Sequence, residues 1–184
     1  MQSGDGIKST TDEKRALFAR QHHRLFRRQL ESPAGGMTGA GIHVLDAFVH
    51  LMGPVTSVSA QLVTRKPPPD PTDMLSAMFR FASGATGVFA TLRSTPDYRR
   101  VHVFGRAGSV EAVGDTDLVL RHSGKPMQLL RFGRVDSLRL ELEAFAAAIS
   151  GGAAYPISTD DMLATITAFE ALVTSAETGR PISC

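Results

Sequence analysis

The chain has 184 residues, of which 42% are hydrophobic and 21% charged, and its formal net charge at pH 7 is +2. This length is sufficient for one well-buried core, and the composition is ordinary for a soluble globular protein. The small charge gives no reason to expect nucleic-acid or membrane binding. The single cysteine, Cys184, excludes an internal disulfide and a cysteine-based zinc site.

No apolar run approaches the ~18 residues that a membrane-spanning helix needs. The N-terminus is polar and has no signal-peptide pattern. With only one cysteine, these features predict a cytoplasmic protein without a membrane partner.

Residues 1–30 differ from the rest of the chain, because they form a basic arm with few large apolar side chains. Leu17, Phe18, Leu25 and Phe26 lie at helical spacing, so we expect this arm to be either helical or partly disordered. Its arginines are typical of a solvated face. Nucleic-acid binding through the arm is an alternative that predicts steep salt dependence.

A second region, residues 31–184, follows a Pro/Gly break at 31–36. A helix is predicted over 38–52, where Ile42, Leu45, Val49 and Met52 recur at helical spacing and Gly53-Pro54 ends the pattern. Alternating apolar residues then predict strands. We expect these at 57–62, 75–81, 88–92, 101–104, 109–113, 118–121 and 127–132.

Two helices are predicted to close the chain. Leu138, Leu142, Phe145 and Ile149 make one apolar stripe. After a cap at Ser158 or Thr159, the second helix is expected to face inward with Met162, Ile166, Phe169, Leu172 and Val173. A helix, a run of strands and two helices predict an α+β fold, a mostly antiparallel open sheet with helices on one face.

The segment 35–46 is the most informative for chemistry, because a glycine-dense turn enters a helix that carries a histidine in its first turns. Glycines let a ligand or another backbone approach closely, and His43 could accept or donate a proton near neutral pH. A packed or solvated histidine is the simpler interpretation of this spacing. His43 and His50 lie about 10 Å apart along a helix, too far to share one metal ion, so no metal site is expected.

The run GGMTGAGIHVLDAFVHLMGPV at 35–55 resembles the helix-opening signature of the Gfo/Idh/MocA oxidoreductase family, with Gly-x-His-x-x-Asp at 41–46. Residues 102–111 are similar to the family's strand–turn–strand segment. Residues 141–145 through 179–182 resemble its closing pair of helices. The three stretches occur in the family's order and span most of residues 31–184.

The resemblance implies a C-terminal α+β domain that works beside an N-terminal Rossmann domain. Such enzymes transfer a hydride between NAD or NADP and a hydroxyl-bearing carbon of a sugar or polyol. By position, His43 is the implied catalytic residue, Thr38 and Asp46 are the implied substrate-binding residues, and Gly41 permits close packing at the turn.

Several departures limit what this chain is expected to do alone. Gly39 stands where many members have an aspartate, and the family's Glu-Lys-Pro tripeptide is absent. No Gly-x-Gly-x-x-Gly follows a strand and opens a helix, so we expect this chain to bind no cofactor alone. A Rossmann-domain partner would then be needed for activity.

A non-enzymatic interpretation is a dimerisation or small-molecule-binding module. An open antiparallel sheet has one face without helices, and a second copy of the chain could cover it. This interpretation predicts a homo-oligomer formed through the open sheet face.

Overall fold

The computed structural model describes residues 37, 41–63, 74–92 and 98–184. The chain divides into two compact units. The first contains residues up to Ser94 together with Leu163–Cys184, and the second is Thr95–Met162. The predicted basic arm at 1–30 lies outside the described residues. None of the helices that the structure describes is long and apolar enough to cross a membrane.

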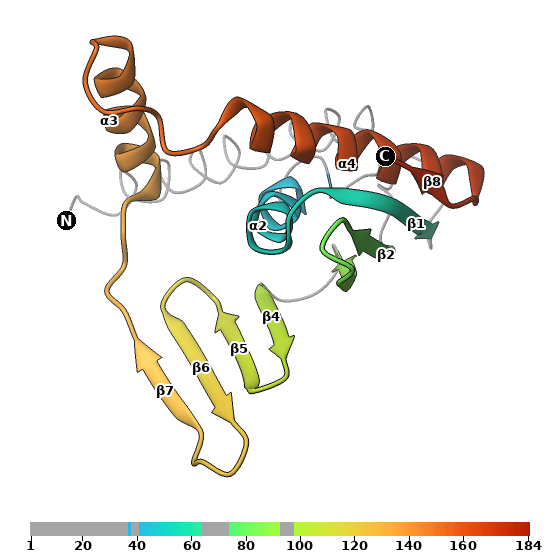
Figure 1. Ribbon diagram of the computed structural model, residues 1–184, viewed down its shortest axis with the longest axis horizontal. Helices are drawn as coiled ribbons and strands as arrows, with labels where there is room; N and C mark the ends of the chain where they lie inside the picture. The colour runs from blue at the N-terminus through green and yellow to red at the C-terminus, as the bar shows by residue number, and fades with distance from the viewer. Residues whose placement is uncertain (1–36, 38–40, 64–73, 93–97) are drawn as a thin grey trace, which may run out of the picture. The chain divides into compact units, whose positions relative to one another are not determined.

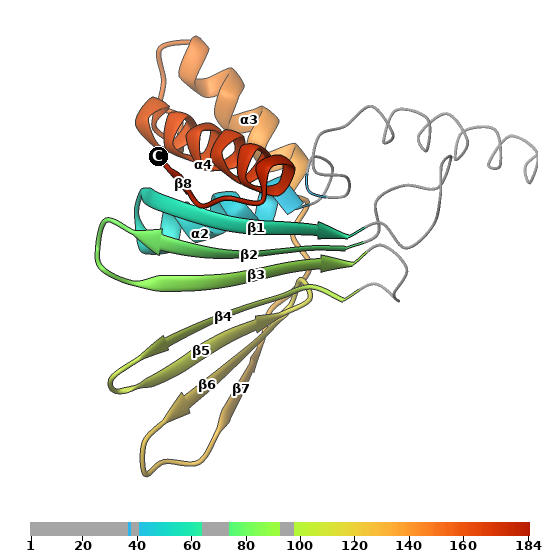
Figure 2. The same ribbon diagram turned by 90° about the vertical axis from the view of Figure 1, so that its right-hand side faces the viewer.

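The first unit is built on a four-stranded antiparallel sheet in the order β3-β2-β1-β8. Its strands are β1 (Val55–Val63), β2 (Met74–Phe81), β3 (Thr86–Leu92) and the short β8 (Ile182–Ser183). Two helices, α2 (Ile42–Met52) and α4 (Thr159–Thr178), lie on the same side of this sheet (Figure 2). The three longer strands and both helices are those that the periodicity predicts, and β8 is additional.

The ends of α2 and α4 follow local sequence signals. Gly53 ends α2 with a φ of 87°, and its N–H donates to the Val49 carbonyl at 2.9 Å. A positive φ favours glycine at such a helix end. At the start of α4, the Ser158 hydroxyl accepts a hydrogen bond from the Asp161 N–H at 3.1 Å, so Ser158 is the predicted cap.

Strands β1 and β2 bury alternate side chains against the helices, as predicted. Val58 and Ala60 on β1 are buried, and so are Phe79 and Phe81 on β2. A period of two therefore sets the buried face of both strands.

The alternating apolar residues of β3 lie on its exposed face. Val88, Ala90 and Leu92 are exposed, whereas Phe89 between them is buried. The antiparallel register places Phe89 opposite Ala77, on the side that the helices cover. Because β3 carries apolar residues at both alternating positions, its period alone does not distinguish the buried face from the exposed one.

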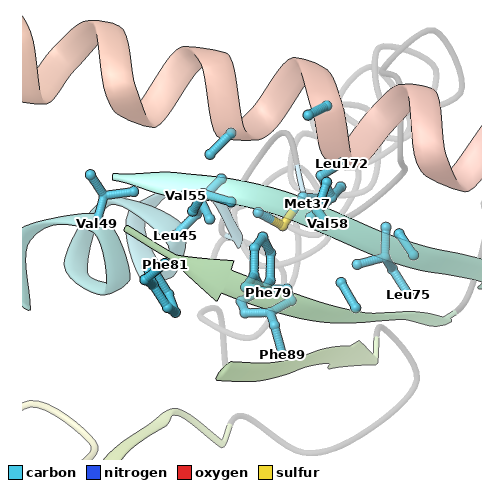
Figure 3. Close-up of a cluster of buried hydrophobic side chains, with 14 residues drawn as sticks. Met37, Leu45, Val49, Val55, Val58, Leu75, Phe79, Phe81, Phe89 and Leu172 are labelled. Carbon is cyan, nitrogen blue, oxygen red and sulfur yellow. The ribbon is translucent and has the colours of Figure 1, made fainter. Parts of the chain in front are cut away.

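The core of the first unit lies between the sheet and the two helices (Figure 3). The ring of Phe48 on α2 meets those of Phe79 and Phe89 edge-on, with centroids 6.3 and 6.1 Å apart. Edge-to-face contacts of this kind favour a fixed arrangement of the rings. Gly87 leaves room for them, since a Cβ there would lie 3.2 Å from Phe81 Cε2 and 3.4 Å from Phe48 Cε2.

The contact side of α4 consists mainly of small residues. Its buried residues are Thr165, Ala168, Ala171, Leu172 and Ser175. The expectation that Met162 and Ile166 face inward is wrong, because both are exposed. Leu172 is buried as predicted, and the predicted Phe169 and Val173 are partly buried against the core. Small side chains let the helix lie close to the sheet, which leaves the larger ones on a neighbouring side of α4.

The second unit contains a four-stranded antiparallel meander in the order β4-β5-β6-β7 (Figure 1). Its strands are β4 (Arg100–Gly105), β5 (Gly108–Val113), β6 (Asp117–His122) and β7 (Gln128–Arg131). All four lie where the sequence predicts strands. The α+β fold class is confirmed, and the described strands form two antiparallel sheets.

The second unit also contains α3 (Ser137–Ile149), which the sequence predicts. Its N-cap is Asp136, whose carboxylate accepts a hydrogen bond from the Arg139 N–H at 3.1 Å. No residue of α3 is buried. The predicted apolar stripe is therefore present on the helix and exposed.

Candidate functional site

Packing is close around Gly41 at the start of α2. Gly41 is the N-cap of α2 and is itself buried. A Cβ at this position would overlap the sulfur of Met37, which has no exposed surface, and would lie 3.4 Å from Phe89 Cζ and Thr91 Cγ2. The glycine is required here by space, because its φ of −68° is open to any residue.

His43 lies in the first turn of α2, two residues after Gly41, and its side chain is exposed. His50 is also exposed, in the last turn of the same helix. Within the described part of the chain, no group of three or more His, Cys, Asp or Glu side chains could hold a metal ion. An exposed imidazole at a helix start is accessible to a molecule arriving from solution, as a proton acceptor requires.

Asp46 lies one turn after His43 and is half-buried. Its Oδ1 accepts a hydrogen bond from the Thr165 hydroxyl of α4 at 2.9 Å. This hydrogen bond thus joins two helices through residues that are 119 positions apart in the sequence. Asp46 has a structural contact in addition to the substrate-binding role that the resemblance implies.

The third residue of the predicted site, Thr38, lies outside the described residues. The structure therefore brings His43 and Asp46 together on one helix and adds Thr165 as the partner of Asp46. Sequence reasoning missed Thr165. The available signal was a threonine among the alanines on one side of α4, where a buried hydroxyl needs a hydrogen-bond partner.

A second polar cluster, also missed, lies on one face of the β4–β7 sheet around Glu111. Only 9% of the Glu111 side chain is exposed, and its carboxylate contacts Arg121 Nη1 at 2.7 Å and Arg100 Nη1 at 3.3 Å. The hydrogen bond from Arg121 holds the pKa of Glu111 below its ordinary value, against the opposing effect of burial. His102 lies opposite Glu111 on β4, and its Nε2 is buried without a hydrogen-bond partner among the described residues.

The same unit has a polar hollow of about 270 Å³ beyond the ends of these strands. It is lined by Arg99, Val113, Gly114, Asp115, Thr116, Asp117 and Arg134. Arg99 and Asp115 form an ion pair across it. The hollow thus has two arginines and two aspartates, so its formal charges balance.

No described part of the chain has the architecture of a dinucleotide-binding fold. Every described strand pair is antiparallel, whereas that fold needs parallel strands joined through a helix. The described strand pairs therefore do not form the parallel sheet of that fold.

Comparison with protein families gives one match. Residues 7–111 match the model of the GFO/IDH/MocA C-terminal domain. This range contains α2 with His43 and Asp46, and it extends through β1–β4 to Glu111 in β5. A comparison with curated proteins found none that matches.

The fold is similar to that of several solved oxidoreductases. The aldose–aldose oxidoreductase from Caulobacter crescentus, complexed with glycerol, is 24% identical with a TM-score of 0.69, over 82% of this chain and 48% of that one. An oxidoreductase from Agrobacterium radiobacter, in complex with NAD⁺, L-tartaric acid and magnesium, is 19% identical with a TM-score of 0.67, over 80% and 48%. Levoglucosan dehydrogenase, in complex with NADH and L-sorbose, is 22% identical with a TM-score of 0.65, over 83% and 50%.

These likenesses identify the fold, and this chain spans about half the length of the structures that it matches. The family match covers more than half of the chain and includes the Gly-x-His-x-x-Asp segment at the start of α2. The chain therefore belongs to the Gfo/Idh/MocA family and contains its C-terminal domain.

Proposed function

We propose that this chain is the substrate-side part of an NAD(P)-dependent oxidoreductase that acts on the CH–OH group of a sugar or polyol. The observation that carries the proposal is His43, exposed in the first turn of α2 within the segment that the family model matches. Gly41, two residues before His43, lies close to Met37 and Phe89, so the helix start that presents His43 is closely packed.

The proposed role of His43 is that of a proton acceptor. Oxidation of a secondary alcohol to a ketone removes a hydride from carbon and a proton from the hydroxyl oxygen. A neutral imidazole within hydrogen-bond reach of that hydroxyl takes the proton as the C=O bond forms. In the reverse direction, the imidazolium returns the proton to the carbonyl oxygen.

The hydride acceptor would be bound outside the described part of this chain, because the strand pairs of that part do not form a dinucleotide-binding fold. A nicotinamide supplies hydride chemistry, whereas a protein binds and orients it. The chain alone is accordingly proposed to be inactive, and a Rossmann-type domain would complete the enzyme.

The substrate class rests on the ligands of the similar structures. Glycerol, L-tartaric acid and L-sorbose all carry hydroxyl groups on neighbouring carbons, and each is present in the complex of one of these proteins. Polar protein groups that hydrogen-bond such hydroxyls discriminate strongly against molecules that lack them.

The test is an NMR titration of the full chain with glycerol, L-sorbose and L-tartrate, following the ring protons of His43 and His50. We expect shifts at His43 and none at His50, which serves as the internal control two turns further along α2. A parallel fluorescence titration with NADH and NADPH should show no micromolar binding. Equal shifts at both histidines, or clear dinucleotide binding by the chain alone, would contradict the proposal.

A second candidate function is self-association through the uncovered face of the β1–β3 sheet. Met78 and Val88 are direct partners across β2 and β3, and they are 64% and 72% exposed. Val63 and Leu92 extend the same apolar face and are also exposed. Burying an apolar face of this kind against a second copy of the chain is favourable, because it removes apolar surface from water.

Sedimentation analysis over a range of concentrations tests this candidate. We expect the wild-type chain to be a dimer, and a Met78→Asp/Val88→Asp variant to be a monomer with the same circular dichroism. A wild-type chain that stays monomeric at high concentration would contradict it.

A further inference from the structure

The polar hollow of the second unit, about 270 Å³ in volume, lies at one end of the β4–β7 sheet. Arg99 comes just before β4, the turn 114–116 joins β5 to β6, and Arg134 follows β7. Three segments of the chain therefore meet at the end of the sheet where β4 begins and β5 ends (Figure 1). Pockets for drug-sized molecules are about 300–1,000 Å³, so this hollow fits a smaller ligand.

Backbone hydrogen bonds fix the walls of the hollow. The Gly114 N–H donates to the Arg99 carbonyl at 2.9 Å, and the Phe132 N–H donates to the Thr116 carbonyl at 2.8 Å. Gly114 has a φ of 60°, in the left-handed region that glycine adopts without strain. Walls that are fixed before a ligand arrives reduce the conformational entropy that is lost on binding.

The charged side chains of the hollow leave one positive charge without a partner. Asp115 forms an ion pair with Arg99, and Asp117 Oδ1 lies 4.0 Å from Nε of Arg131. The exposed Arg134 forms no ion pair with another residue that the structure describes. Its guanidinium presents N–H donors in a planar fork that matches the two oxygens of a carboxylate. A ligand with one negative charge would therefore balance the charge of Arg134.

The other polar atoms of the hollow favour a ligand with hydroxyl groups. A carboxylate accepts several hydrogen bonds, so the oxygens of Asp115 and Asp117 can accept from hydroxyls in addition to their arginine contacts. The Thr116 hydroxyl, which donates to Asp117 Oδ1 at 3.3 Å, can itself accept from a ligand. Two carboxylates also repel a dianion, which disfavours inorganic phosphate.

We propose that this hollow binds a small hydroxycarboxylate, a molecule with one carboxylate and several hydroxyl groups. Arg134 would bind the carboxylate, and Asp115 and Asp117 would accept hydrogen bonds from the hydroxyls. The inference goes beyond the proposed function and does not depend on it, because the hollow is lined by residues of the second unit whereas His43 belongs to the first.

The first test uses NMR titrations of the full chain at constant ionic strength with four probes. D-Gluconate has both features, D-sorbitol lacks the carboxylate, propionate lacks the hydroxyls, and inorganic phosphate is the alternative anion. We expect saturable shifts of the Gly114 and Thr116 amide signals with gluconate, and at least about tenfold weaker binding of the other three. The signals of Gly105 and Gly108, at the other end of β4 and β5, should not move.

The second test changes the arginine. Arg134→Gln should weaken gluconate binding at least about tenfold, because it removes the partner of the carboxylate. Arg134→Lys keeps the charge without the planar fork and should recover only part of the affinity. Arg106→Gln is the matched control, since it removes an exposed arginine from the turn between β4 and β5. It should leave the affinity unchanged, and all three variants should have the wild-type urea midpoint.

Sorbitol, propionate or phosphate binding as tightly as gluconate would overturn the proposal. So would the absence of saturable shifts at Gly114 and Thr116, or an Arg134→Gln chain that binds gluconate like the wild type. His43→Gln should leave the gluconate shifts at Gly114 unchanged, and their loss in this variant would also overturn it. The shifts of His43 with glycerol and L-sorbose are measured separately, so the hollow and the proposed function can fail independently.

Discussion

The hydroxyl of Thr165 donates a hydrogen bond to Oδ1 of Asp46 at 2.9 Å, which links α4 to α2 one turn after His43. Thr165 is buried and Asp46 is half-buried. A hydrogen bond to a carboxylate in such a place is stronger than one between neutral groups, because the charge has lost part of its hydration. The position of α2 against α4 therefore depends on a contact beside the candidate catalytic residue.

Thr165→Val should destabilise the protein by about 1–2 kcal/mol, because the valine keeps the shape and removes the donor to a half-buried carboxylate. Urea unfolding measures the loss. Thr165→Ser restores the hydroxyl and should recover most of it. If valine and serine have equal effects, the hydrogen bond contributes nothing.

Ser175→Ala should cost about 1–3 kcal/mol, since it leaves the N–H of the buried Ala60 without its partner. Ser175 has no exposed surface. Its Oγ accepts from the Ala60 N–H at 2.9 Å and donates to the Arg180 carbonyl at 2.6 Å. The neighbouring Thr174→Ala is the control. Thr174 is exposed, and its hydroxyl donates to the Glu170 carbonyl of the same helix, so removing that hydroxyl should leave the urea midpoint nearly unchanged.

Stability of the second unit should fall in acid through Glu111. Arg121 lowers the pKa of Glu111 from its ordinary value of 4.5, so the folded state favours the ionised carboxylate. The stabilisation is fully present above pH 4.5 and is lost as the pH falls through the lowered folded-state value. Unfolding followed from pH 7 to pH 2 should show a smaller acid loss for Glu111→Gln than for wild type. Glu143→Gln, on an exposed ion pair, should retain the wild-type profile.

Gly41→Ala should destabilise the protein by about 1–3 kcal/mol through overpacking at the start of α2. The added Cβ would overlap the Met37 sulfur, which is the end of a flexible side chain inside a packed core. In a Met37→Ala background the same change should cost less, and a double-mutant cycle measures the difference. Gly133→Ala, which meets no atom within 4 Å, should be neutral in both backgrounds.

Apart from the short β8, the sequence by itself determined the helices and strands and their order. Gly53-Pro54 ends α2, Ser158 caps α4, and the alternation in β1 and β2 identifies the side chains that they bury. These features are local, because backbone conformation, capping and period depend on residues a few positions apart. The Gly-x-His-x-x-Asp segment was identified by its resemblance to the family, and it lies at the start of α2 as expected.

Only the tertiary structure decided which sides of β3 and α4 are buried and which residues meet. Phe89 is the buried residue of β3, because its pairing with Ala77 places it on the side of the sheet that the helices cover. Small residues of α4 face the sheet. The helix therefore approaches β1 closely enough for the Ser175 hydroxyl to accept a hydrogen bond from the Ala60 N–H. The partner of Asp46 is 119 residues away, and such a contact depends on the packing of both helices on one sheet, which no local pattern records.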